Sequence, residues 1–360
     1  MASTQVKTTP TFMVYVNNSR LALEREGDIQ EITVIEKVDS PSSFSIIVSD
    51  FKDMDKQTEN KRKWADWDDV APGSEVKISL GYVDDVEEVM NGEVTALSPM
   101  FSNFGGDRLI IRGHNFLHRL VRAKKTRAFT GDIKDSDIIK QIADEAGLSS
   151  DIDNIGIKHL FTMQRNQTDY DYLMDMAVKY NCKVWAKEKK LYFKKLQENS
   201  GEDVIVEWGK TLIDFNAYLD TSKLITEVEV RGWDPEKSEA VVGSKTVDDI
   251  TLKIGGSKFG GSIVKEKFGD AKMIYIDENV IDKNGADQLA LDIITENSMN
   301  YITGSGKIQG DYKIKAGTVI KINEISEKFS DKYYVTSVKH VFNQHQGYMT
   351  YFEVARNATP

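Results

Sequence analysis

The segment Gly73-Ser74-Glu75-Val76-Lys77-Ile78, followed after a polar gap by Val94-Thr95-Ala96-Leu97, has a near copy later in the chain. The copy is Gly317-Thr318-Val319-Ile320-Lys321-Ile322, followed by Val335-Thr336-Ser337-Val338. The glycine and the second valine are 94 − 73 = 21 residues apart in the first copy and 335 − 317 = 18 in the second. Each copy combines a glycine-led strand, an acidic connection and a β-branched return strand. We therefore predict two similar units of β-structure, with chance similarity between two ordinary hairpins as the alternative. The two acidic connections are Tyr82–Glu88 and Asn323–Lys328.

The composition bounds the class of protein. The chain has 360 residues, which favours two to four domains. Its 40% hydrophobic and 29% charged residues are typical of a soluble globular protein. A net charge of −10 without a long basic tract disfavours nucleic-acid binding. The single cysteine, Cys182, excludes an intramolecular disulfide, and we interpret it as a packing residue rather than a nucleophile.

No targeting or membrane-spanning segment is visible. The stretch Met1–Lys7 lacks the apolar centre of a secretory signal, and no run approaches the roughly 18 apolar residues of a membrane span. We expect a protein that is made in the cytoplasm without a signal peptide and does not insert stably into membranes.

Residues 1–123 are predicted to form a first antiparallel β-barrel. Short β-rich runs separated by turn residues suggest a small closed or nearly closed barrel. Asn91-Gly92 predicts a tight turn before the return strand. Between Asp55 and Asp69 a charged stretch carries Trp64 and Trp67, which we expect in a short helix or loop, as candidates for contacting a partner. The expected strands are Phe12–Val16, Ile32–Val38, Ser43–Val48, Val76–Tyr82, Glu93–Leu97 and Arg108–Gly113.

Residues 124–203 read as a small α/β domain. Asp135-Ser136-Asp137 predicts the start of a helix that Gly147 stops. Thr168-Asp169-Tyr170-Asp171 has the spacing of a capping box, with Asp in place of Glu. The helix that follows has one apolar face, and a hairpin comes after it. That face is formed by Leu173, Met176, Ala177 and Tyr180, and the hairpin by Lys183–Ala186 and Leu191–Phe193.

The second barrel is expected to be discontinuous. It takes residues 204–233 and 307–360, interrupted by a looser insert over 234–306 with one helix at Ala286–Met299. The overall prediction is a mainly β fold with α/β insertions: two similar small antiparallel β-barrels, a small α/β domain and a helix-containing insert.

A local basic cluster could be a solvated connector or a salt-bridging interface. It consists of Arg119, Arg122, Lys124, Lys125 and Arg127. The chain also has exposed-aromatic candidates for subunit interfaces, each of which could equally be core. These are Trp64, Trp67, Trp208 and Trp233.

We find no pattern that argues for catalysis. His114 and His118 have a metal spacing only within a helix and lack a third ligand; His340 and His345 flank an expected hairpin turn. Gly255-Gly256-Ser257-Lys258 does not have the spacing of a phosphate loop and is better interpreted as a mobile loop. Acidic pairs are expected by chance among 57 acidic residues. We therefore predict no catalytic, cofactor-binding or metal-binding residues, no cofactor and no enzymatic activity.

Four segments of the chain together point to a known protein family. The first is Gly81-Tyr82 with Val89–Val94, and the second is Phe161–Leu173 with its following hairpin. The third is Val228–Asp234, resembling the strand that opens the second barrel. The fourth is the closing hairpin, Lys332–His340 with Gly347–Phe352. In this order they cover nearly the whole chain, and together they resemble the late control protein D family of contractile phage tails, which is similar to the hub part of VgrG-type spike proteins.

This resemblance implies a structural baseplate hub. Three chains would place six barrels in a pseudo-sixfold ring that joins the sixfold inner tube to a threefold spike. The expected partners are two further copies of the chain, a separate spike protein, the inner tube or its initiator, and other baseplate proteins. The separate spike is inferred because the chain stops at Pro360, where VgrG-type proteins continue. A negative charge would suit a lumen that does not trap acidic cargo.

The setting and two other functions stay open at this point. The particle could be a phage tail, a tailocin or an extracellular injection system. The alternatives are a tail-associated cell-wall hydrolase, which would need a catalytic carboxylate, and a carbohydrate-binding β-protein, which would show clustered exposed aromatics on one barrel face.

Overall fold

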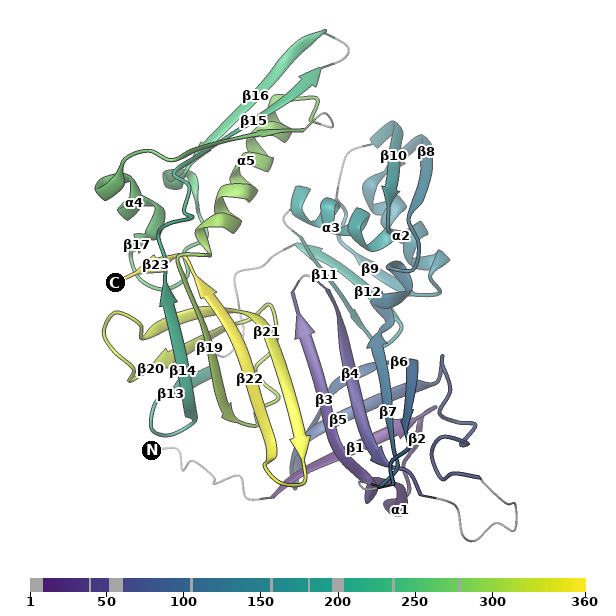
Figure 1. Ribbon diagram of the computed structural model, residues 1–360. Helices are drawn as coiled ribbons and strands as arrows, with labels where there is room; N and C mark the ends of the chain where they lie inside the picture. Colours follow the sequence, from purple (N-terminus) through teal and green to yellow (C-terminus); the bar gives the residue numbers. More distant parts are fainter. Residues whose placement is uncertain are drawn as a thin grey trace.

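The computed structural model describes residues 9–360 except 39, 52–60, 104–105, 156–157, 181, 196–203, 235–236 and 278–279. Most of the strands belong to one large sheet, drawn along the bottom of Figure 1. The α/β unit stands above one end of this sheet and the insert above the other (Figure 1). The mainly β fold with α/β insertions is confirmed. Among the described residues no helix has the length and apolar character that a membrane crossing needs.

The first strand set surrounds its own hydrophobic cluster. Its strands pair in the order β3-β4-β7-β6-β5-β1. The alternating residues Val76, Ile78 and Leu80 are buried in this cluster, because successive side chains of a strand point to opposite faces. The set comprises β1 (Pro10–Val16), β3 (Ile29–Lys37), β4 (Ser40–Ser49), β5 (Glu75–Tyr82), β6 (Asp85–Met100) and β7 (Arg108–Asn115), with the short β2 (Ser19–Arg20) and α1 (Leu23–Glu26).

The second strand set repeats this arrangement. Its strands pair in the order β14-β19-β22-β21-β20-β13, around a second hydrophobic cluster. Five strands correspond one to one; the sixth differs, because β13 pairs in parallel whereas β1 pairs antiparallel. The set comprises β13 (Val204–Glu207), β14 (Leu212–Leu219), β19 (Ile302–Gln309), β20 (Val319–Asn323), β21 (Asp331–Asn343) and β22 (Gly347–Arg356).

The two sets are joined edge to edge. Strand β21 of the second set pairs antiparallel with β3 of the first, over seven residue pairs from Ser337↔Lys37 to Asn343↔Glu31. The sequence did not predict this pairing, which makes one sheet of the two sets.

The repeat extends to single hydrogen bonds. The Gly73 N–H donates to Val94 O (2.8 Å) and the Val94 N–H to Ser74 O (2.9 Å). The Gly317 N–H donates to Val335 O, and the Val335 N–H to Thr318 O, both at 2.8 Å. Both glycines have positive φ, at 95° and 81°, a conformation that favours glycine.

The β-bulges coincide as well. A register shift separates Val94 from Ala96 on β6, and the same shift separates Val335 from Ser337 on β21. A second shift separates Ile29 from Glu31 on β3, matched between Leu212 and Asp214 on β14. Chance similarity between two ordinary hairpins does not produce this agreement in both hydrogen bonds and bulges.

Two expectations about the first copy were wrong. Asn91-Gly92 is no turn but lies inside β6; the turn is at Val83 and Asp84, whose φ is 69°. Gly92 is instead a point of close approach, since a Cβ there would lie 2.1 Å from His114 O of β7. Most of the acidic stretch Tyr82–Glu88 is therefore strand, whereas the second copy does have a loop between Asn323 and Asp331.

The helix start and stop signals predicted in the α/β unit are found in the structure. The Thr168 hydroxyl accepts from Asp171 N (3.0 Å) and the Asp171 carboxylate from Thr168 N (3.3 Å), so the capping box is confirmed. Gly147, with φ 70°, follows the first helix as expected. The unit comprises η1 (Phe116–Leu120), β8 (Lys125–Lys134), α2 (Asp135–Glu145), β9 (Ser149–Ile152), β10 (Lys158–Gln167), α3 (Asp169–Lys179), β11 (Cys182–Lys187) and β12 (Lys190–Lys195).

The insert is more ordered than expected and begins earlier. The strand predicted at Val228–Asp234 does not open the second strand set; it is β15 (Glu227–Asp234), which pairs with β16 and β18 in a separate sheet covered by α5. The strands of that set that precede the insert are β13 and β14. The insert also contains β16 (Glu239–Thr246), η2 (Val247–Asp249), β17 (Lys258–Phe259), α4 (Gly260–Phe268), β18 (Lys272–Ile276) and α5 (Lys283–Ser298), and β17 pairs with the terminal β23 (Ala358–Thr359).

Candidate functional site

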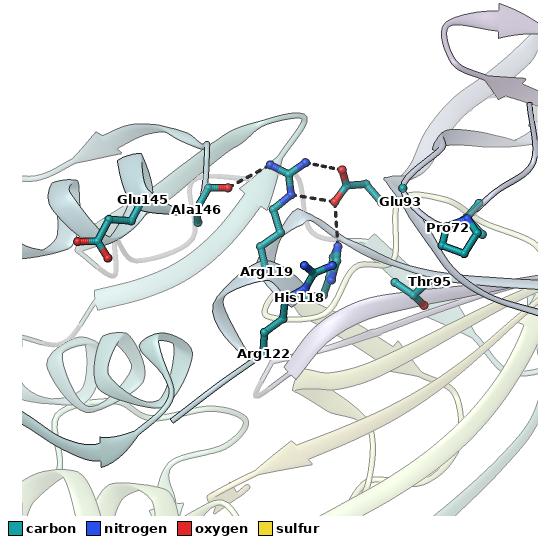
Figure 2. Close-up of a pocket in the computed structure, with 10 residues that line it drawn as sticks. Pro72, Glu93, Thr95, His118, Arg119, Arg122, Glu145 and Ala146 are labelled. Carbon is teal, nitrogen blue, oxygen red and sulfur yellow. Dashed lines mark hydrogen bonds and ion pairs between the residues drawn. The ribbon is translucent and has the colours of Figure 1, made fainter. Parts of the chain in front are cut away.

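A charged pocket lies where the first strand set meets the α/β unit (Figure 2). Glu93 reaches it from β6, Arg119 and His118 from η1, and Ala146 from the end of α2. The pocket has a volume of about 580 Å³, which is enough for a small molecule.

The polar groups of this pocket are already paired with one another. The Glu93 carboxylate accepts hydrogen bonds from both Arg119 Nε (2.8 Å) and Arg119 Nη2, and lies 2.9 Å from His118 Nε2. Arg119 Nη1 donates to Ala146 O at 3.0 Å. One guanidinium therefore fastens β6 to the end of α2, as the dashed lines in Figure 2 show.

The electrostatics favour a structural role for Glu93. Burial of this carboxyl opposes its ionisation, but the hydrogen bonds from Arg119 and His118 outweigh burial and lower its pKa. A carboxylate with a lowered pKa and three hydrogen bonds is a poor general base. We interpret the pocket as a joint between two parts of the molecule rather than as an active site.

A second ionic network holds the α/β unit together. Asp169, at the start of α3, accepts from Lys125 Nζ (2.6 Å) and Arg127 Nη2 (2.8 Å) of β8. Arg127 also pairs with Glu145 of α2. Of the two interpretations of the basic cluster, the salt-bridging interface applies to Arg119, Lys125 and Arg127. The cluster's other members, Arg122 and Lys124, are exposed.

The histidines are held by neighbouring side chains. The His114 and His118 ring centroids are 6.2 Å apart; His118 contacts Glu93, and His114 Nδ1 lies 3.2 Å from Thr95 Oγ1. Across the described part of the chain, no three His, Cys, Asp or Glu side chains gather as a metal site. His345 lies in the hairpin turn and is exposed.

His340 is buried beside Tyr348 and Thr350. Its Nδ1 lies 2.9 Å from the Tyr348 hydroxyl and 3.1 Å from Thr350 Oγ1. Burial, with Lys315 nearby, lowers its pKa to about 3. This histidine is neutral in the folded protein near pH 7.

The Gly255-Gly256 segment is packed, not loose as we expected. Its Gly256 N–H donates to the Asp331 carboxylate at 2.7 Å, so this amide is already occupied by an anionic group. A Cβ on Gly255 would lie 2.8 Å from Arg356 Cδ. Arg356 itself is fully buried, stacked on Tyr333 with its Nη2 donating to Lys328 O.

The tryptophans divide into core and surface. Trp64, proposed as an interface anchor, is buried: its Nε1 donates to Asp28 (2.9 Å) and its ring packs edge-on against Trp67. It lies in a turn, not a helix, and residues 52–60 of the same stretch are outside the described residues. Trp208 and Trp233 are 49% and 51% exposed and remain candidates.

The exposed tryptophans do not form a sugar platform. Trp185 lies in the α/β unit, Trp208 next to the second strand set, and Trp233 in the insert. A carbohydrate site predicted as clustered aromatics on one barrel face is not supported by their placement.

Comparison with known proteins assigns the family. The model described as the Alg8 N-terminal domain matches residues 6–344. The chain belongs to the Alg8 N-terminal domain family. Late control protein D, to which the motifs pointed, is not the family whose model matches, and stays a resemblance. No curated protein sequence matches the chain.

Solved structures of tail proteins share the fold of this Alg8 N-terminal domain protein. The 43 kDa tail protein of prophage MuSo2 from Shewanella oneidensis superposes with a TM-score of 0.71 at 11% identity, covering 97% of this chain and 98% of that one. A tail protein from Neisseria meningitidis gives 0.69 at 10% identity, with 97% of each chain covered. An Escherichia coli component of the type VI secretion system gives 0.56 at 11% identity, covering 92% of this chain and 76% of that one. At these identities the likeness shows the fold alone.

Proposed function

We propose that this chain is a non-enzymatic structural hub in the baseplate of a contractile tail or injection system. Three copies form a ring that meets the sixfold inner tube on one face and the threefold spike on the other. Its other contacts are with the tube initiator and further baseplate proteins, and it needs no cofactor.

The observation that carries this proposal is the internal repeat. Two strand sets agree in the order of five strands, in the hydrogen bonds of Gly73 and Gly317, and in two bulges. Three chains with two alike sets each present six alike units, which is what a threefold protein needs to match a sixfold tube. The fold shared with solved tail proteins supports the same role.

The absence of enzymatic activity is supported by the pocket in Figure 2. Its buried carboxylate, Glu93, is held by Arg119 and His118, and its lowered pKa makes it a weak base. No observation favours a cell-wall hydrolase.

The mass of the purified protein in solution tests the proposal. Sedimentation equilibrium at micromolar concentration, without spike or tube, should give three times the chain mass of 40.7 kDa. A protein that stays a monomer over this concentration range would contradict it.

A further inference from the structure

We infer that β6 of one copy pairs antiparallel with β14 of the next copy, in the register that β21 and β3 use inside the chain. The inference rests on the proposed hub, because it names the surface by which the copies associate. The partner is a second copy of this chain, and the contact is the edge-to-edge extension of the sheet.

The template is the joint between the two strand sets. There, Lys339 stands opposite Ile35, and His340 opposite Val34. The Val38 N–H donates to Thr336 O at 3.2 Å, at the bulge of β21. This bond places Lys339 and Ile35 at a non-hydrogen-bonded pair, where side chains of facing strands lie closest.

Each strand of the joint has an equivalent elsewhere. Strand β6 corresponds to β21 through the shared bulge, so Ser98 is equivalent to Lys339 and Pro99 to His340. Strand β14 corresponds to β3, so Tyr218 is equivalent to Ile35 and Ala217 to Val34. In the described residues, the side of β14 away from β19 is paired only at its first residue, Leu212, which forms an isolated bridge with Trp208. Residues Asp214–Leu219 of β14 on that side, and Ala96–Met100 on the side away from β7, pair with no other described strand.

Side chains on the open edges of β6 and β14 are more exposed than their equivalents in the β21–β3 joint. Val341 of the joint is 7% exposed, whereas its equivalent on β6, Met100, is 52% exposed. Val34 is fully buried, whereas its equivalent on β14, Ala217, is exposed, and the next residue, Tyr218, is 65% exposed. Long apolar side chains on an unpaired sheet edge favour pairing with another chain.

Transferring the register pairs compatible side chains. On the core side, Leu97 comes opposite Leu219, and Pro99 opposite Ala217; both leucines already pack against their own cores. On the other side, Ser98 comes opposite Tyr218. Core-side residues therefore face core-side residues, and residues of the other face meet each other, as in the β21–β3 joint, because side chains alternate along a strand.

Pro99 costs the joint one hydrogen bond. By the same transfer, Pro99 and Ala217 form a hydrogen-bonded pair, in which the Ala217 N–H donates but Pro99 has no N–H to return. Proline is found on edge strands for this reason, and it also discourages pairing with unrelated strands.

The contact is head-to-tail, since β6 and β14 are different surfaces: β14 is the first strand of the sheet order, and β6 lies in the other strand set (Figure 1). Contacts of this kind generate a ring when the rotation closes. The β21–β3 pairing inside each chain and the β6–β14 pairing between chains would then have the same geometry. A ring of three copies contains three pairings of each kind, and these six equivalent contacts join its six strand sets.

Disulfide trapping tests the register. In a Cys182→Ala background, which removes the single native thiol, we would introduce Ser98→Cys and Tyr218→Cys together. Mild oxidation should convert most of the protein to covalent multimers that end at the trimer on a non-reducing gel. The second non-hydrogen-bonded pair, Met100→Cys with Asn216→Cys, should give the same covalent multimers. It serves as the test if the first variant misfolds.

The matched control is Ser98→Cys with Ala217→Cys. A one-residue shift turns the two thiols to opposite faces of the sheet, so this variant should stay uncrosslinked. The inference is overturned if the protein sediments as a trimer but neither in-register pair crosslinks, or if the control crosslinks equally; the proposed hub would survive either result. A monomer would overturn both.

Discussion

Arg119 connects three parts of the chain through one side chain. It donates to Glu93 of β6 and to Ala146 at the end of α2, while lying itself in η1. Replacing it, as in Arg119→Met, leaves the largely buried Glu93 carboxylate with His118 alone. We expect a loss of about 2 kcal/mol in the free energy of unfolding, below the cost of breaking a fully buried pair because Arg119 is 27% exposed. Urea unfolding at pH 7 measures it.

The control is Arg122→Met, at an exposed position lining the same pocket. It should change the free energy of unfolding by less than about 0.5 kcal/mol. Since the pKa of Glu93 is lowered, the stability it contributes is present above the unfolded value near 4.3 and is lost as pH falls through the folded pKa. The gap between wild type and Arg119→Met should therefore narrow below about pH 4. If Arg119→Met and Arg122→Met lost equal free energy of unfolding, the Arg119 contacts would not hold β6 and α2 together as we infer.

His340 should lower the free energy of unfolding on acidification at a higher pH than Glu93 does. Its pKa is about 3 in the folded state against about 6.5 in an unfolded chain, so between these values the unfolded state binds the extra proton. The contribution of neutral His340 to the free energy of unfolding is complete above about pH 6.5. It falls by up to about 1.4 kcal/mol per pH unit as the pH decreases toward 3.

The comparison of urea unfolding at pH 7 and pH 5 measures this effect. His340→Gln should show a smaller fall in stability between the two pH values than the wild type. His345→Gln, at an exposed turn, should follow the wild type. A wild-type pH dependence unchanged by His340→Gln would show that other groups carry it.

At the residue scale, the sequence predicted side chains whose role is local. The capping box of Thr168 and Asp171 depends on four consecutive residues and was found as predicted. Trp64 was misassigned because its partner, Asp28, is 36 residues away in sequence. Glu93 was passed over as a site residue for the same reason, since its partners His118 and Arg119 are 25 and 26 residues distant.

At the scale of elements, β6 depends on Gly92 for its close contact with β7. A Cβ at this position would lie 2.1 Å from His114 O, a backbone atom that cannot move aside without distorting the sheet. We expect Gly92→Ala to cost at least about 2 kcal/mol of stability, as overpacking against a rigid neighbour does.

The matched control for Gly92→Ala is Gly27→Ala, at the end of α1. Gly27 has a φ of −65°, and a Cβ there would meet nothing closer than 3.5 Å. Alanine should be neutral or slightly stabilising at that position. Thermal unfolding of both variants distinguishes them, and equal melting temperatures would refute the close-contact explanation.

Gly92 also explains an error in the sequence interpretation. Asn-Gly is a strong hairpin signal, and local sequence does not distinguish a glycine required by a turn from one required by a neighbouring strand. The helix Asp169–Lys179 and the β11–β12 hairpin, which depend on local periodicity, were predicted correctly. The β21–β3 pairing could not be, because it joins residues about 300 positions apart.

At the scale of the whole molecule, the repeat relates chain architecture to assembly. The two sets share five strands in the same order, joined by β21 and β3, and leave β6 and β14 as open edges. The insert and the α/β unit stand on the same side of this sheet and differ from each other (Figure 1). We expect the sheets to form the near-sixfold part of the assembly, and these two additions to keep its symmetry threefold.

The most direct test is an electron cryo-microscopy reconstruction of the purified protein without imposed symmetry. We expect three chains in one ring, with six alike strand sets and β6 of each copy beside β14 of the next. A ring in which the two strand sets of a chain lie at different levels, or contact different kinds of neighbour, would contradict it.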